Sequence, residues 1–152
     1  MSQAAHNPVL IAVELGAEWP RWMSDLVRKS PRRVVSQEEG EEPLGFAERA
    51  ARVAAALAEG GGLGSAVVLC NERTDGKQDA ARRRLAASLL PELRGRGKLV
   101  LTGSPQASEP LRDALMALAR EVEGGQAASV LRFGERAVSA RSGSRRPVAK
   151  VA

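Results

Sequence analysis

The chain has 152 residues, 43% of them hydrophobic, which suits one domain with a buried core. Aromatic residues make up only 3%, and this scarcity argues against nucleic-acid binding by base stacking. The single cysteine excludes an internal disulfide and a cysteine-based zinc site, and the single histidine, His6, argues against a histidine-based catalytic triad.

Five apolar segments predict β-strands, because each is short and most end at a glycine or a polar residue. They lie at residues 9–15, 32–37, 66–71, 98–102 and 129–133. Between them, apolar residues recur at helical spacing and predict helices. These helices lie at 44–59, 77–94 and 108–123, with a short helix or helical loop at 18–29.

Strands that alternate with helices predict an α/β fold with a mostly parallel sheet of about five strands. We expect a three-layer sandwich of Rossmann-like or flavodoxin-like type, in which the strand at 32–37 could instead be an antiparallel edge strand. Residues 1–134 would form this single domain. Residues 135–152 contain one acid and five basic residues among Gly, Ser, Ala and Pro, and predict a flexible basic tail.

Two segments resemble functional motifs, but a purely structural role explains each of them better. The glycine-rich stretch at 59–65 ends a predicted helix and precedes a strand, the reverse of a phosphate-binding loop, so we interpret it as a helix C-cap and loop. Cys70 ends an apolar strand with no histidine nearby, so we interpret it as a buried core residue; the alternative is a reactive thiol.

Two other segments are candidates for binding a ligand at the carboxyl edge of the sheet. After the strand at 98–102, the residues Thr102, Gly103 and Ser104 lead to a helix N-terminus, where hydroxyls and free N–H groups can bind an anion. After the strand at 66–71, the candidates are Asn71, Arg73 and Thr74. Ordinary turn and cap chemistry is the alternative for the first segment.

Charged residues predict that the two edges of a parallel sheet differ. The residues that precede strands are basic, and those that follow strands are mainly acidic, among them Glu14, the cluster at 38–42 and Glu72. Ligands of α/β sheets bind at the carboxyl edge. An acidic crevice there would suit a cation, a metal–nucleotide or a basic peptide, whereas acids at helix N-termini can also simply complement the helix dipoles.

Candidate residues for partner binding lie in two places. The only tryptophans, Trp19 and Trp22, would form a contact patch if exposed, or else pack against the end of the sheet. In the tail, Arg141, Arg145 and Arg146 could bind a protein or a nucleic acid.

We therefore expect a non-catalytic domain that binds a macromolecular partner, a protein in the first place, in a regulatory or assembly role, without a cofactor or metal. One alternative is a nucleotide- or anion-binding domain that uses the carboxyl edge; a second is a nucleic-acid-associated protein that uses the tail. Whether the protein is an enzyme stays open, although no catalytic residues stand out. No signal peptide or membrane span is visible, which predicts a cytoplasmic location.

Overall fold

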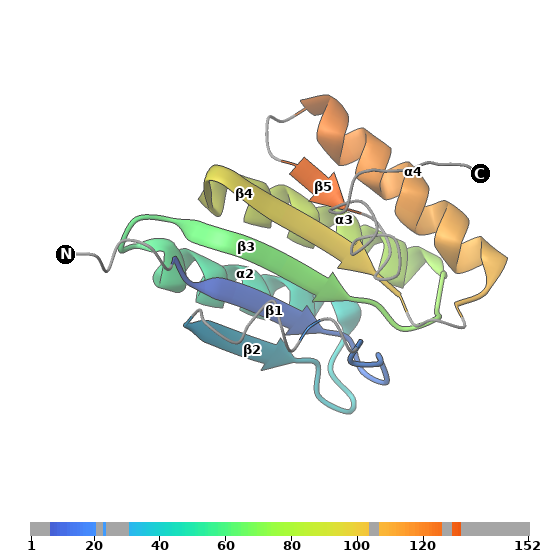
Figure 1. The fold of residues 1–152 in the computed structure, drawn as a ribbon. Helices are drawn as coiled ribbons and strands as arrows, with labels where there is room; N and C mark the ends of the chain where they lie inside the picture. The colour runs from blue at the N-terminus through green and yellow to red at the C-terminus, as the bar shows by residue number, and fades with distance from the viewer. Residues whose placement is uncertain (1–6, 21–22, 24–30, 104–106, 126–128, 132–152) are drawn as a thin grey trace.

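The protein is an α/β domain with a five-stranded parallel sheet flanked by helices (Figure 1). The structure, a computed structural model, describes residues 7–20, 23, 31–103, 107–125 and 129–131. The strands are β1 (Val9–Val13), β2 (Arg32–Ser36), β3 (Leu63–Leu69), β4 (Leu93–Thr102) and β5 (Ser129–Leu131). Their order across the sheet is β2-β1-β3-β4-β5, which is the order of flavodoxin-like sheets.

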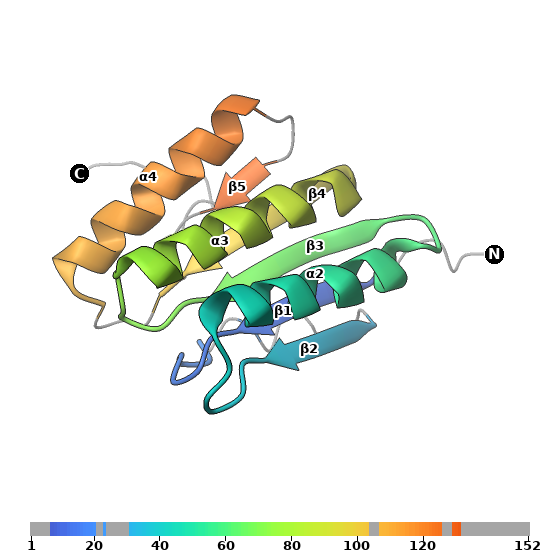
Figure 2. The same cartoon turned by 180° about the vertical axis from the view of Figure 1, so that it is seen from behind.

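Three described helices cover one face of the sheet, as the two opposite views show (Figures 1 and 2). They are α2 (Pro43–Ala58), α3 (Gly76–Leu89) and α4 (Glu109–Gly125). Together with the sheet they enclose the larger core, built mainly of Ala, Val and Leu. Four alanines of α2 are buried, and such small side chains allow close contact with α3 and the sheet.

A smaller core lies on the opposite face of the sheet. Val9 and Ile11 of β1 and Val67 and Leu69 of β3 point to this face, where Met23 is fully buried against them. The residues that would complete a third layer, at 18–29, fall mostly outside the described residues.

The predicted α/β fold and parallel sheet are confirmed, and the open question about the second strand is answered. Residues Arg32–Ser36 pair in parallel with Val9–Val13 at the edge of the sheet. The strand is exposed apart from Val35, which explains why its apolar signal in the sequence is short. The tail at 135–152 lies outside the described residues, so its predicted flexibility stays a prediction.

The fourth strand begins five residues earlier than predicted. Pro91 lies in a 3-10 turn, Leu90–Glu92, that follows α3, so the helix ends before it. Leu93 then pairs with Leu63, and the register shifts before Lys98 pairs with Ser65. A bulge with Gly95 in the left-handed region absorbs the extra residues.

Residues 59–62 form a helix end and turn, as predicted, whereas residues 63–65 already belong to β3, which begins three residues earlier than predicted. The N–H groups of Gly61 and Gly62 both donate to the carbonyl of Ala58, the last residue of α2. Gly62 has a φ of 97° and lies against the backbone of Glu92, so a side chain would be strained there. Among the described residues, no helix is both long and apolar enough to cross a membrane.

Candidate functional site

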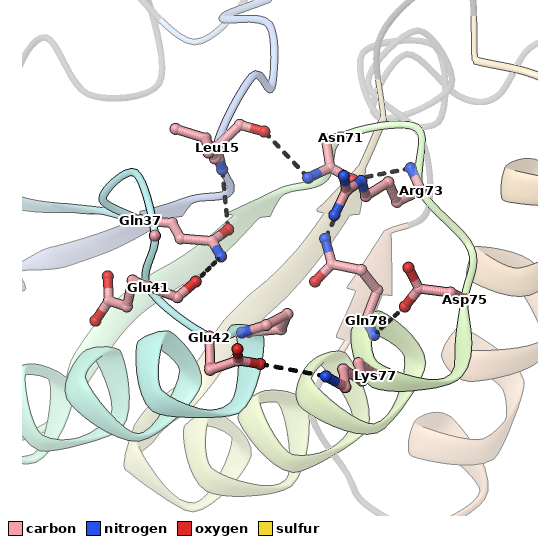
Figure 3. A pocket seen from close by; sticks show the side chains of 11 residues that line it. Leu15, Gln37, Glu41, Glu42, Asn71, Arg73, Asp75, Lys77 and Gln78 are labelled. Carbon is pink, nitrogen blue, oxygen red and sulfur yellow. Dashed lines mark hydrogen bonds and ion pairs between the residues drawn. The ribbon is translucent and has the colours of Figure 1, made fainter.

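A polar crevice of about 460 Å³ lies at the carboxyl edge of the sheet (Figure 3). Because the strands are parallel, the loops after β1, β2 and β3 meet at this edge, and the three loops line the crevice. We call it the carboxyl-edge crevice. It is lined by Leu15, Gln37, Gly40, Glu41, Glu42, Pro43, Asn71, Arg73, Asp75, Lys77 and Gln78.

The loop after β2 is braced by two side chains. Gln37 accepts a hydrogen bond from the Leu15 N–H at 3.0 Å and donates to the Glu41 carbonyl at 2.8 Å. Arg49 of α2 forms a two-pronged ion pair with the Glu41 carboxylate, at 3.0 and 2.8 Å. The hydrogen bond from Arg49 outweighs partial desolvation and lowers the pKa of Glu41. This wall of the crevice is therefore held in place before any ligand arrives.

The loop after β3 is braced in the same way. Asn71 donates to the Leu15 carbonyl at 3.0 Å and accepts from the Arg73 N–H at 2.9 Å. Asp75 caps α3 by accepting from the Gln78 N–H at 2.9 Å. The side-chain amides of Gln37 and Asn71 thus join the loop after β1 to the loops after β2 and β3.

A buried ion pair lies beneath the crevice. Arg82 of α3 donates to both oxygens of Glu14, at 2.7 and 2.8 Å, and both side chains are 4% exposed. The Asn71 N–H donates to the same carboxylate at 2.8 Å. Burial opposes the Arg82 charge, but the hydrogen bonds to Glu14 prevail and raise its pKa. Glu14 thereby joins the end of β1 to α3 and to the loop after β3.

Gln78 connects this buried pair to the crevice. Its side chain is 3% exposed, and its Nε2 lies 3.2 Å from Asn71 Oδ1 and 3.4 Å from Glu14 Oε1. The Gln78 oxygen points toward the space within the ring of lining residues (Figure 3). Among the described residues, no donor to this oxygen is recorded.

The expected acidic character of the carboxyl edge is corrected in part. Glu14 is buried and paired with Arg82, so its charge does not reach the crevice. Glu41 is paired with Arg49, and the exposed Glu42 lies 3.7 Å from Lys77. The described lining contains three acids, Glu41, Glu42 and Asp75, and two bases, Arg73 and Lys77. With Arg49 added, bases and acids are equal in number next to the crevice, while the loops after β2 and β3 carry three further exposed acids, Glu38, Glu39 and Glu72.

The loop after β3 contributes both of the described ligand-binding candidates that line the crevice. Asn71 and Arg73 line it, and Thr74 is exposed in the same loop but does not line it.

Of the candidates at the end of β4, the described residues Thr102 and Gly103 are not among those that line the crevice. Thr102 and Gly103 are buried at the end of β4. A Cβ on Gly103 would lie 3.0 Å from Leu111 Cδ2 and 3.4 Å from Ala107, so close packing against α4 explains this glycine. Ser104 lies outside the described residues.

The predicted partner-binding residues are described only at Trp19, which is 46% exposed. Trp22, Arg141, Arg145 and Arg146 lie outside the described residues. Partner binding through these side chains stays a prediction.

Cys70 is buried, as expected for a core residue. It is 1% exposed, and burial raises the pKa of its thiol well above the usual value. A neutral, inaccessible thiol is a poor nucleophile. In the described part of the chain, no group of three or more His, Cys, Asp or Glu side chains could hold a metal ion.

Neither Gln78 nor Arg82 is among the candidate residues that the sequence predicted. The informative signal is the buried stripe of α3, which contains Gln78, Ala81, Arg82 and Leu85. Two polar side chains at i and i+4 in an otherwise apolar stripe must find buried partners. This pattern points to the end of a neighbouring strand, where Glu14 lies.

The described polar lining consists of three side-chain amides, three carboxylates and two basic side chains, all of which can form hydrogen bonds or ion pairs. No protein-family model matches the chain, and a search of curated proteins likewise finds no match.

Proposed function

We propose that the domain binds a small anionic ligand, of about the size of a mononucleotide, in the carboxyl-edge crevice. The position of the crevice is the observation that carries this proposal. From β1 the chain continues to β2 on one side, and from β3 to β4 on the other, so the winding reverses between β1 and β3. In parallel α/β sheets, ligands bind outside the carboxyl ends of the strands at such a junction.

The size and rigidity of the crevice support the same function. Its volume of about 460 Å³ lies within the range typical of small-molecule sites. Gln37, Asn71 and Asp75 fix its loops through hydrogen bonds to backbone groups. A site that is already ordered loses little conformational entropy when a ligand binds.

Two helix N-termini and two basic side chains support an anionic group on the ligand, although Glu42 and Asp75 lie beside them. Helices α2 and α3 begin at Pro43 and Gly76, and both N-termini border the crevice (Figure 3). The positive ends of these helix dipoles favour an anion. Arg73 and Lys77 provide exposed cationic side chains beside them. Lys77 faces Glu42 at 3.7 Å in an exposed and therefore weak pair, which a stronger anion can displace.

The function first expected, binding of a protein partner, remains a separate proposal. Its candidate surface includes Trp19, which is exposed beside the loop that follows β1. A cytoplasmic location also remains an expectation from the sequence.

A thermal-unfolding experiment tests the proposed function. AMP and inorganic phosphate are the probes, and the variants are Arg73→Gln and the control Arg33→Gln, which changes an exposed arginine of β2. A ligand at ten times its Kd stabilises the folded state by about 1.4 kcal/mol, so we expect AMP to raise Tm by roughly 3–6 °C.

We expect Arg73→Gln to reduce the AMP-induced rise and Arg33→Gln to preserve it, because hydrogen bonds to charged groups contribute about 1.5–3 kcal/mol. If neither AMP nor inorganic phosphate raised the Tm of the wild type, the proposal would be contradicted. Equal stabilisation of wild type and Arg73→Gln would contradict the assignment of the site.

A further inference from the structure

The side-chain oxygen of Gln78 is a buried acceptor that has no donor among the described residues and faces the crevice (Figure 3). The residue is 3% exposed, so its carbonyl has little access to bulk solvent. Buried polar groups in native proteins nearly always have a partner, and an exception calls for an explanation.

The direction of this oxygen is set by its neighbours. Gln78 Nε2 faces Asn71 Oδ1 and Glu14 Oε1, and both of these atoms are acceptors. Turning the amide over would place three acceptor oxygens together, which is unfavourable. The donor side of the amide therefore faces the interior, and the acceptor side faces the crevice.

The two neighbours cannot rotate to relieve this constraint. Asn71 Oδ1 also accepts from the Arg73 N–H and from Arg82, while Asn71 Nδ2 donates to Leu15. Glu14 is held by both prongs of Arg82. The buried ion pair thus acts through Asn71 and Gln78 to fix one acceptor at the crevice.

We infer that Gln78 Oε1 determines ligand specificity by accepting a hydrogen bond from an N–H or O–H group of the ligand. This inference rests on the proposed function, to which it adds a second recognition element. The ligand carries an anionic group for Arg73 and Lys77 and a donor group for Gln78. A mononucleotide meets both requirements, through its phosphate and through a ribose hydroxyl or a base amino group.

A set of matched ligands tests the inference. The probes are AMP and three analogues that each lack one donor: 2′-deoxy-AMP, 3′-deoxy-AMP and purine riboside 5′-monophosphate. An analogue that lacks the donor group bound by Gln78 leaves Oε1 unpaired. We therefore expect one of the three, which we call the sensitive analogue, to bind wild type about 10- to 100-fold more weakly than AMP.

The variants are Gln78→Met, which removes the amide at similar length, and Gln37→Met, which removes a lining amide whose oxygen and nitrogen are both occupied. In Gln78→Met we expect AMP and the sensitive analogue to bind equally. In Gln37→Met we expect the wild-type preference to persist, even if all affinities fall. Such a cycle isolates the coupling between Gln78 and the ligand donor.

A second measurement uses the unaltered protein, in case Gln78→Met does not fold. We expect AMP to shift the side-chain NH₂ resonances of Gln78, and the sensitive analogue to shift them much less.

The possible failures are distinguishable. If AMP binds wild type and Arg73→Gln weakens it, but no analogue depends on Gln78 and its NH₂ resonances do not move, the inference is overturned and the proposed function stands. If neither AMP nor inorganic phosphate binds, both are overturned.

Discussion

Removing Arg82 tests whether the buried ion pair holds the crevice loops together. In Arg82→Met, Glu14 loses both prongs of its partner and keeps the Asn71 N–H at 2.8 Å and Gln78 Nε2 at 3.4 Å. Leaving one charge of a buried pair without its partner costs about 3–5 kcal/mol. We therefore expect the free energy of unfolding to fall by about that amount.

The double variant Glu14→Met with Arg82→Met separates this cost from simple loss of packing. It buries no charge, and its main penalty is the Asn71 N–H, which loses its acceptor, at about 1–3 kcal/mol. The double variant should therefore be more stable than Arg82→Met alone. Arg83→Met is the matched control, because Arg83 forms only exposed ion pairs with Asp79 and Glu121 and should cost less than about 1 kcal/mol.

Urea unfolding followed by far-UV circular dichroism provides the measurement. With a slope of about 1–3 kcal/mol per molar, the midpoint of Arg82→Met should fall by roughly 2 M. If Arg82→Met and Arg83→Met had similar midpoints, or if the double variant were the least stable of all, the reasoning about the buried pair would be refuted.

Three further predictions concern single residues. Pairing with Arg49 lowers the pKa of Glu41 below 4.5, so the ion pair contributes fully to stability above that pH and its contribution is lost as the pH falls. Glu41→Gln should therefore reduce the loss of stability on the acid side of a stability–pH profile, and an unchanged profile would contradict the pairing. Cys70 should react with a thiol reagent such as DTNB only as fast as the protein unfolds, so rapid labelling under native conditions would exclude its structural role. Gly103→Ala should lower the free energy of unfolding by about 1–3 kcal/mol through overpacking against Leu111 and leave AMP affinity unchanged. Loss of AMP binding without loss of stability would instead show that Gly103 belongs to the ligand site.

Much of the architecture could be predicted because its signals are local. A buried parallel strand such as Leu63–Leu69 is a continuous apolar run, and α2 repeats its apolar residues at helical spacing. The early start of β4 was missed because Gly95 and Gly97 belong to a bulge, which breaks the apolar pattern of the strand.

The candidate site was predicted only in part, because it depends on which loops meet. Asn71 and Arg73 were identified as residues that follow a strand, and the structure places them at the crevice. Gly103 follows a strand too, yet α4 covers it. The pairing of Glu14 with Arg82 joins residues 68 positions apart and follows from the packing of α3 on the sheet. Local pattern alone cannot indicate such a contact.

The most direct test of the central claim is a titration of the ¹⁵N-labelled protein with AMP, followed by ¹H–¹⁵N correlation spectra. The account predicts saturable shifts of the backbone amides of Leu15, residues 37–42 and residues 71–78, which border the carboxyl-edge crevice. The amides of Arg33, near the amino end of β2, and of Lys98, which pairs with Ser65 at the level of the first residue of β1, should stay unchanged. Shifts confined to that opposite edge, or spectra that do not change with AMP, would contradict the account.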